Sequence, residues 1–136
     1  MWSSNAFLKR CEKLKELGLS AEPDTGMRVA RGFADLGYEE FYCLSNKKLV
    51  SIFTGHLSDL TSEHARFFFE IPPVEELIDR ILKQRYDVEA FTYVDQRVWS
   101  TQFRHTQSGE LLETSDREFS CSIAEALLHI AQKGRQ

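Results

Sequence analysis

The sequence predicts an α+β fold in which amphipathic helices pack on an antiparallel sheet within a single domain. Segments 86–94 and 97–105 are rich in β-branched and aromatic residues and are separated by a two-residue break at 95–96, as in a pair of strands. Apolar residues recur with helical spacing before and after them, over 74–85 and 123–133. A chain of 136 residues can bury a core without disulfides or metal ions to stabilise it, so one domain over 1–136 is expected.

The N-terminal part of the chain, residues 1–66, is predicted to combine helices with short strands. Asn5 can cap a helix over 6–17, because four apolar side chains in that range share one face. Apolar spacing from 24 to 36 predicts a second short helix, although two glycines inside it weaken the helix by about 1 kcal/mol each relative to alanine. A strand over 27–30 is the alternative for this segment.

Further strands are expected in the rest of this part. Segments 40–44 and 48–54 are rich in aromatic and β-branched residues, which favours strands, and 55–58 is expected to be a loop. The threonine–serine pair at 61–62 can cap a single helical turn. The continuous apolar run at 67–71 is typical of a strand buried on both faces.

The C-terminal part, residues 67–133, is predicted to be a strand, a helix, three strands and a final helix. A proline suits a helix start, because its missing N–H would be unpaired there, so Pro73 opens a helix that ends near Arg85. This helix has the clearest apolar stripe in the sequence, made of Val74, Leu77, Ile78, Ile81 and Leu82. A turn at 106–109 leads from the second strand to a shorter third strand over 110–114.

The final helix has its own start and stop signals. Ser122 and Glu125 have the spacing of a capping box, in which the serine accepts from first-turn N–H groups and the glutamate reaches back. A helix over 123–133 follows, and Gly134 stands where a helix is expected to end.

The predicted sheet has two unequal faces. Strict alternation places Phe91 and Tyr93 on the face opposite Val88 and Ala90. Since helices are expected to cover one face, the other is left with large aromatic residues, which indicates a second layer, a subunit interface or a ligand site. The chain holds ten Phe, two Trp and four Tyr, more than we expect one protomer to bury. A homo-oligomer, most simply a two-fold dimer, is therefore the preferred prediction.

The order of elements in the second half is similar to that of a known group of proteins. The run Phe67-Phe-Phe-Glu-Ile-Pro-Pro, the helix at 74–82, three strands and the helix at 123–131 resemble small phage and mobile-element proteins with an α-β-β-β-α sandwich. The last helix of those proteins carries an E-A-L-type segment after a short serine-containing loop, and Glu125-Ala126-Leu127 supplies that segment here. The resemblance implies the sandwich fold and a mobile genetic origin, and it supplies no catalytic residues.

Composition and charge argue against several classes of protein. A hydrophobic content of 42% with 28% charged residues is typical of a globular chain, not a disordered one. The net charge of −4 disfavours a general nucleic-acid binder. Cys11, Cys43 and Cys121 are widely spaced and no secretory leader is seen, so reduced thiols in a cytoplasmic protein are expected. No apolar run approaches the roughly 20 residues that a membrane helix needs.

A metal site is the first alternative to weigh. His56, Asp59, Glu63 and His64 fall within nine residues and are of types that ligate zinc or iron. The two histidines, His56 and His64, are eight residues apart across a predicted loop and not at helical spacing, so solvated loop residues are favoured and no metal is predicted. His129 is expected to be a packed, hydrogen-bonded residue at the edge of the core. No phosphate-binding glycine loop occurs, and no cofactor is predicted.

An enzymatic alternative rests on Cys121 and His105. Cys121 precedes the predicted final helix, whose N-terminus would favour the thiolate form, and His105 on the neighbouring strand would be its base. No nucleophile signature such as G-x-S-x-G supports this pair. The sequence therefore favours a buried cysteine and a protein that is not an enzyme, with a small-metabolite enzyme as the alternative.

A nucleic-acid surface is the remaining alternative. Basic side chains and exposed rings, on which single-stranded bases could stack, can gather on the sheet at Lys83, Arg85, Arg97, Arg104, Tyr93 and Trp99. Acidic side chains at 87, 89 and 95 would repel phosphate groups. A nucleic-acid-associated regulator therefore ranks below an aromatic pocket for a small organic ligand, and both rank below an oligomer interface.

These observations together predict a non-enzymatic, self-associating binding or adaptor module. Its expected ligand site is an aromatic pocket formed by Tyr93, Trp99, Phe103, His105 and Arg97. The expected partners are a second copy of the chain and a small organic ligand, without a membrane or nucleic acid.

Overall fold

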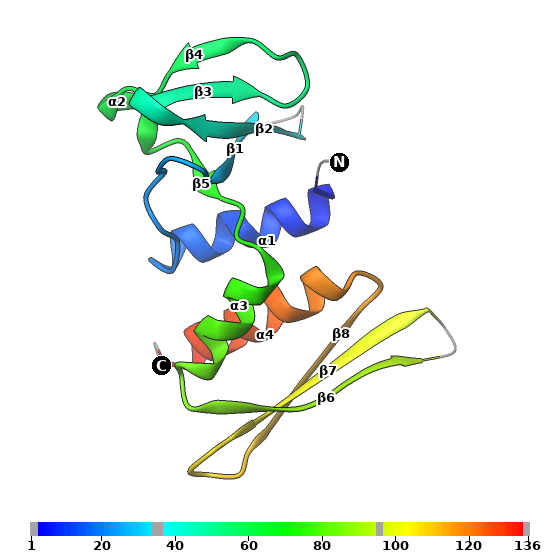
Figure 1. Ribbon diagram of the computed structural model, residues 1–136. Coiled ribbons are helices and arrows are strands. Elements are labelled where there is room, and N and C mark those ends of the chain that lie inside the picture. The colour runs from blue at the N-terminus through cyan, green and yellow to red at the C-terminus, as the bar shows by residue number, and fades with distance from the viewer. Residues whose placement is uncertain (1–2, 34–36, 95–96, 135–136) are drawn as a thin grey trace. The chain divides into compact units, whose positions relative to one another are not determined.

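The computed structural model describes residues 3–33, 37–94 and 97–134, and it confirms the α+β class (Figure 1). Helices account for 34% and strands for 36% of the structure, and the sheets are antiparallel. Backbone contacts divide the chain into two compact units, Met1–Pro72 and Pro73–Gln136, each with its own sheet.

The first unit contains a five-stranded antiparallel sheet in the order β4-β3-β2-β1-β5. Its strands are β1 (Arg28–Phe33), β2 (Gly37–Leu44), β3 (Lys48–Ser51), β4 (Leu57–Asp59) and β5 (Phe69–Glu70). Its helical segments are α1 (Asn5–Glu16), the short 3-10 helix η1 (Ser45–Lys47) and α2 (Ser62–Ala65). The order of strands places β2 at the centre, with β3 on one side and β1 on the other, so β1, β2 and β3 are each paired along both edges.

Helix α1 forms where the apolar spacing predicts it, and its buried face consists of Phe7, Leu8, Cys11 and Leu14. The cap differs by one residue from the prediction. Ser4, not Asn5, is the N-cap, and its hydroxyl accepts a hydrogen bond from the N–H of Phe7 at 3.1 Å. The cap and the buried face together explain why this segment is helical.

The helix predicted over 24–36 is wrong, and the alternative of a strand over 27–30 is confirmed by β1; the end of that predicted helix, at 34–36, lies outside the described residues. Two glycines with positive φ, Gly26 at +86° and Gly37 at +84°, stand before and after the strand. Val29 and Ala30 point to opposite faces and are both fully buried. Pairing with β2 along its whole length outweighs the helical spacing of a few apolar residues.

The other predicted strands of this unit form with shifted ends. The strand expected over 48–54 ends at Ser51, and the loop expected over 55–58 contains the start of β4. A helical turn capped by Thr61 is present, with the hydroxyl of Thr61 accepting from the N–H of His64. The run at 67–71 shortens to β5, because Phe67 is 55% exposed while Phe68 and its successors are buried.

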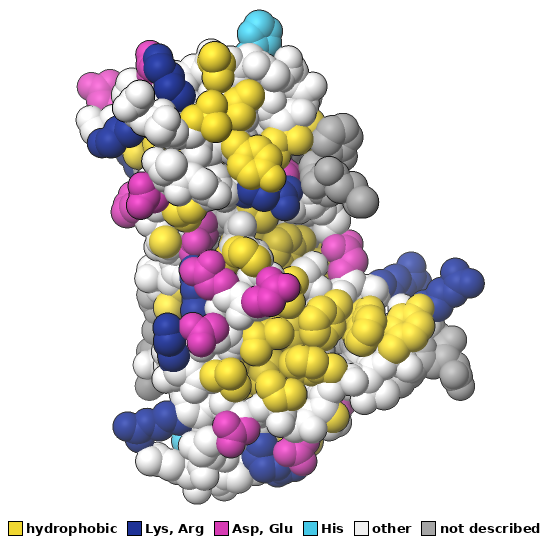
Figure 2. All heavy atoms as spheres, viewed as in Figure 1, with side chains coloured by type: hydrophobic (Ala, Val, Ile, Leu, Met, Phe, Trp, Pro, Cys, Tyr) yellow, Lys and Arg dark blue, Asp and Glu magenta, His cyan; other side chains and the backbone are white. Residues whose placement is uncertain are grey.

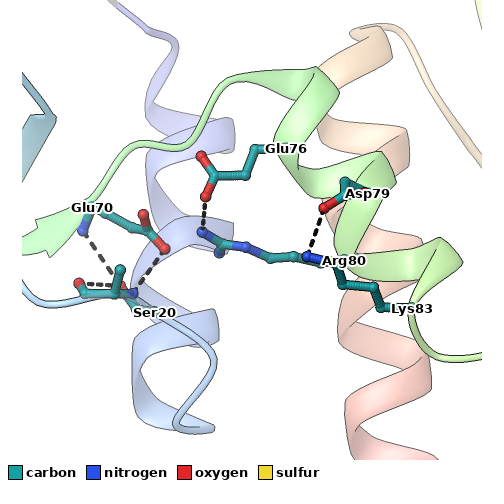
Figure 3. Close-up of polar contacts among 7 residues, drawn as sticks. Ser20, Glu70, Glu76, Asp79, Arg80 and Lys83 are labelled. Atoms are coloured by element: carbon teal, nitrogen blue, oxygen red, sulfur yellow. Dashed lines mark hydrogen bonds and ion pairs between the residues drawn. The ribbon is translucent and has the colours of Figure 1, made fainter.

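Polar side chains also tie the first unit together. Glu70 of β5 is buried, and its carboxylate accepts from the N–H of Ala21 at 2.9 Å. The hydroxyl of Ser20 accepts from the N–H of Glu70 at 3.4 Å, so the loop after α1 is held to β5 (Figure 3). These bonds satisfy groups that burial would otherwise leave unpaired.

The second unit has the order α-β-β-β-α. Its elements are α3 (Val74–Leu82), β6 (Tyr86–Val94), β7 (Val98–His105), β8 (Leu111–Asp116) and α4 (Phe119–Lys133), and the sheet order is β6-β7-β8. The two helices pack on each other and on one face of the sheet (Figure 1). The element order is the one that the resemblance implies, and the predicted break at 95–96 lies outside the described residues.

Helix α3 is amphipathic as predicted. Leu77 and Ile81 are fully buried, and ion pairs between i and i+4 cover its outer side. Glu76 pairs with Arg80 at 2.8 Å and Asp79 with Lys83 at 2.9 Å (Figure 3). The helix ends at Leu82, three residues before the predicted end near Arg85.

The predicted capping box at Ser122 is wrong, because α4 begins at Phe119 and its N-cap is Glu118. Ser122 lies inside the helix and is fully buried. Its hydroxyl is 2.8 Å from the hydroxyl of Thr101 on β7, so it joins the helix to the sheet. The predicted end before Gly134 is confirmed.

A β-bulge changes which side chains of β6 face the helices. The register against β7 shifts between Val88 and Ala90, which adds one residue to β6. Phe91 and Tyr93 therefore lie on the same face as Phe103, toward the helices, and the prediction that they lie on the opposite face from the helices is wrong. The opposite face carries mainly polar side chains, at Asp87, Thr92, Ser100, Gln102, Arg104, Glu113 and Ser115.

Candidate binding surface

Four aromatic rings form a continuous row on the helix-facing side of the second unit's sheet. The aromatic row consists of Phe91, Phe119, Trp99 and Tyr93, in that order. Successive ring centroids are 5.2 Å, 5.0 Å and 5.1 Å apart. Phe103 adjoins the inner end of the row, with its centroid 5.7 Å from that of Phe91. Tilted and edge-to-face contacts of this kind each contribute about 1 kcal/mol beyond simple burial.

Exposure rises along the row from one end to the other. Phe103 is fully buried, the three middle rings are half-buried, and Tyr93 is 55% exposed. Hydrophobic side chains gather over this hairpin in the space-filling view (Figure 2). The row therefore continues the core of the second unit onto its surface.

The surface exists because the hairpin is longer than the helix layer that covers it. The β6–β7 hairpin extends past the first turn of α4 (Figure 1). Phe119, the first residue of that turn, is the last helical side chain that reaches the rings. Tyr93 and Trp99 are a directly opposite cross-strand pair, so both rings stand beyond the helix on one face.

Charged side chains of both signs surround the aromatic row. Arg97 and Arg117 are exposed, and neither forms an ion pair with another of the described residues. Asp116 is directly opposite Trp99 in the register, and its carboxylate accepts from the N–H of Glu118 at 3.0 Å. Residues of both charges thus lie near the ends of β7 and β8 that carry Trp99 and Asp116.

The structure brings together only three of the five residues predicted to form the ligand site. Tyr93, Trp99 and Arg97 lie at the same end of the hairpin. Phe103 is in the core and cannot contact a ligand at the surface. His105 lies six residues along β7 from Trp99, about 20 Å away at the usual rise of a strand.

His105 belongs to a turn and not to the aromatic row. Its Nδ1 accepts from the N–H groups of Gln107 and Ser108 at 3.3 Å and 3.1 Å. Its ring meets that of Tyr86 edge-on, with centroids 5.0 Å apart. These contacts explain the position of the ring without a catalytic role.

Cys121, the nucleophile of the enzymatic alternative, lies in the first turn of α4 and is fully buried. Its thiol donates to a carboxylate oxygen of Glu118 at 3.5 Å. A substrate would reach this sulfur only if the helix moved.

Two of the four basic residues proposed for nucleic acid are neutralised by carboxylates. Arg104 contacts Glu89 at 3.1 Å, and Lys83 pairs with Asp79. The hydrogen bond from Arg104 lowers the pKa of Glu89, and the same bond raises the pKa of Arg104. These pairs reduce the positive charge available to phosphate groups.

The fold gives no support to the predicted alternative of a metal site. Asp59 forms an ion pair with Lys48 across β3 and β4, and His64 is a residue of the short helix α2. Within residues 3–33, 37–94 and 97–134, no three His, Cys, Asp or Glu side chains are grouped to hold a metal ion. His129, expected to be packed, is exposed and lies 3.6 Å from Glu125 on the same helix.

Sequence reasoning missed Phe119 and Arg117 of this surface. Phe119 precedes the predicted start of the final helix, so it was expected to lie in a loop. An earlier helix start would have revealed it, since Phe119 lies four residues before the apolar Ile123.

It also missed a hollow in the first unit, about 320 Å³ in volume and lined by Glu12, Gly32, Phe33, Gly37 and Tyr38. Tyr38 donates its hydroxyl to Glu12 Oε1 at 2.9 Å. Burial first, and then this carboxylate, raises the pKa of Tyr38 to about 12. The residues come from α1, β1 and β2, and no sequence pattern connects them.

Among the described residues, no helix is long and apolar enough to cross a membrane. Comparisons of the chain with protein-family models, with curated proteins and with solved structures found no match.

Proposed function

We propose that the protein is a non-enzymatic, self-associating binding module and that two copies meet through the aromatic row. The observation that carries this proposal is the row itself, which leaves the core and ends at Tyr93 with more than half of that side chain exposed. Covering exposed apolar rings with another protein surface removes them from water, and this lowers the free energy of the complex relative to the separate chains. A specific interface needs about 800 Å² per partner, and the row would supply its apolar centre.

The charges beside the row favour a second copy of the chain as the partner. Arg97 and Arg117 lie on the same edge as Asp116 and Glu118, so the edge carries both signs. A two-fold axis across the row would place the cations of one copy opposite the carboxylates of the other. A polyanion such as nucleic acid would instead require an excess of positive charge.

Two further observations support the proposed cellular location and genetic origin of this module. All three cysteines are free and buried, which suits the reducing cytoplasm that we propose as its location. The α-β-β-β-α order of the second unit agrees with the sandwich of the mobile-element proteins that the sequence resembles. We therefore keep a mobile genetic origin within the proposal.

Sedimentation velocity across a range of micromolar concentrations tests the proposal. The wild-type chain is expected to sediment as a dimer, and Tyr93→Ser is expected to raise the dimer dissociation constant by more than about tenfold. Tyr42→Ser is the matched control, because Tyr42 is an exposed tyrosine of the first unit. Its dissociation constant should match that of the wild type.

Two results would reject self-association through the row. One is a wild-type monomer at every concentration; binding of a small aromatic compound that quenches Trp99 fluorescence would then favour the small-ligand alternative. The other is a dimer that Tyr42→Ser dissociates and Tyr93→Ser does not. Far-ultraviolet circular dichroism on each variant separates loss of association from loss of fold.

A further inference from the structure

The hollow of the first unit is lined by two glycines, a carboxylate and two aromatic side chains. Gly32 and Tyr38 are directly opposite in the β1–β2 register. A Cβ at Gly32 would lie 3.3 Å from the ring of Tyr38 and 3.4 Å from Glu12 Oε2. Because Gly32 has no side chain, the ring and this carboxylate can pack closely against β1, and the hollow opens beside them.

The two oxygens of Glu12 have different surroundings. Oε1 accepts the hydroxyl of Tyr38 at 2.9 Å, which orients the carboxylate. Oε2 borders the hollow and accepts no hydrogen bond from the residues that the structure describes. A half-buried carboxylate oxygen without a donor is an acceptor available to a ligand.

The ring of Tyr38 is held in place on its other sides. Phe69 meets it edge-on, with the centroids 5.7 Å apart and the planes at 90°. Its hydroxyl is engaged by Glu12, so neither rotation nor displacement of the ring is free. A positioned aromatic ring beside a carboxylate is the arrangement that recognises organic cations.

We propose that this hollow binds a small organic ammonium ion, with Glu12 Oε2 as the acceptor and Tyr38 as the ring beside the cation. An anion is disfavoured, because the carboxylate would repel it. A metal ion is disfavoured as well, because Mg²⁺ or Ca²⁺ needs several oxygen ligands and the hollow supplies one free carboxylate oxygen.

The size and surrounding charges agree with a ligand of this class. A volume of about 320 Å³ is at the small end of ligand sites. Glu16, on the same helix, adds negative charge near Tyr38. The cation of the neighbouring strand, Arg31, lies over the ring of Phe33 and 3.8 Å from Glu39, so its charge is partly offset.

Nuclear magnetic resonance titration of the full chain with n-butylammonium chloride tests the proposal. Resonances of the Tyr38 ring, assigned by their loss in Tyr38→Phe, are expected to shift with a saturable, low-millimolar dissociation constant. The neutral alcohol 1-butanol, of similar shape, should give no saturable shift of these resonances. Equal shifts with both probes, or none with n-butylammonium, would overturn the proposal.

Two substitutions locate the binding site. Glu12→Gln removes the charge and keeps the shape, and it should weaken n-butylammonium binding by about tenfold or more. Gly32→Ala keeps the charge but places a methyl group 3.3 Å from the ring of Tyr38 and 3.4 Å from Glu12 Oε2, so both recognition groups must shift and the same loss is expected. Glu16→Gln is the control: its side chain is exposed and does not line the hollow, so affinity should change less than about twofold in physiological salt.

These variants also distinguish this site from the aromatic row. Tyr93→Ser should leave n-butylammonium binding unchanged, because Tyr93 belongs to the other unit. Unchanged affinity in both Glu12→Gln and Gly32→Ala would show that the cation binds elsewhere, and the inference would fail while self-association stayed intact. If Glu12→Gln does not fold, Gly32→Ala and the comparison of charged with neutral probes decide the question.

Discussion

The two units stabilise buried polar groups in different ways. The first unit buries a charge: Glu40 is fully enclosed, and its carboxylate accepts from Arg28 at 2.5 Å and from the N–H of Ser3 at 2.5 Å. The second unit buries three neutral hydroxyls, those of Thr101, Thr114 and Ser122. Both arrangements join distant parts of a unit, yet the consequences of removing one member differ.

The hydroxyl cluster is satisfied from several directions. The hydroxyl of Thr101 lies 2.7 Å from that of Thr114 and 2.8 Å from that of Ser122. Thr114 also donates to the carbonyl of Ser122 at 2.8 Å. Since each hydroxyl both donates and accepts, the loss of one leaves the others with partners.

The charged cluster lacks this redundancy. Removing Glu40 would leave the guanidinium of Arg28 without its carboxylate, although 30% of that side chain remains accessible to water. An uncompensated buried charge costs more than a missing neutral hydrogen bond. The comparison teaches that the first unit should be the more sensitive to loss of a single polar residue.

The largest expected loss of stability comes from removing a buried apolar side chain, which changes no polar group of either unit. Phe103→Ala removes a fully buried ring that packs on Phe91, and it should lower the free energy of unfolding by about 4 kcal/mol. Phe67→Ala, at an exposed phenylalanine of the first unit, should lower it by less than about 1 kcal/mol. Urea denaturation measures both. A tolerated Phe103→Ala would contradict the assignment of Phe103 to the core.

Glu40→Ala tests the charged cluster of the first unit. We expect the free energy of unfolding to fall by about 3 kcal/mol, because Arg28 and the N–H of Ser3 lose their acceptor. Glu39→Ala is the matched control, since Glu39 is partly exposed and bonds to Ser51. A cost for Glu40→Ala no larger than that of the control would break the comparison.

Thr101→Val tests the hydroxyl cluster of the second unit with nearly unchanged side-chain shape. The expected loss is about 1 kcal/mol, because Thr114 and Ser122 keep their bond to each other. Thr92→Val, on the polar face of the same sheet, should change stability by less than about 0.5 kcal/mol. A loss as large as that of Glu40→Ala would show that the neutral cluster is not redundant.

The last prediction concerns alkaline pH and the first unit alone. The pKa of Tyr38 is raised to about 12 from 10.0, chiefly by burial and then by Glu12. The folded state therefore holds the phenol proton more tightly than the unfolded chain. Its contribution to stability is complete below pH 10.0 and is lost as pH rises through about 12. Tyrosinate absorbance should show one late-titrating tyrosine, and Tyr38→Phe should remove it; an unchanged titration curve would contradict this.

Much of the second unit could be predicted because its signals are local. The apolar stripe of α3 repeats at helical spacing, and alternation over 98–105 places Thr101 and Phe103 on one face, where both are buried. The first unit was harder, because the spacing over 24–36 suits a helix by itself. Only pairing with β2 makes that segment a strand, and pairing depends on residues that local spacing does not include.

For the candidate surface as well, some residues could be predicted from local sequence and others could not. Tyr93, Trp99 and Arg97 lie close in sequence at one end of a hairpin, so the hairpin prediction is enough to group them, although strict alternation gives Tyr93 the wrong face. Phe119 joins them from a helix that begins four residues before its predicted start. His105 and Phe103 were included because alternation gives the face of a side chain, but not its depth or its distance along the strand.

The sequence by itself determined the α+β class, the amphipathic helices and the hairpin with its aromatic residues, because these follow from the periodicity of neighbouring side chains. Tertiary structure decided the bulge beside Glu89, the start of α4 and the meeting of Glu12 with Tyr38. Each of those depends on contacts between residues far apart in the chain. Local patterns leave such alternatives nearly equal in energy, and packing then selects one of them.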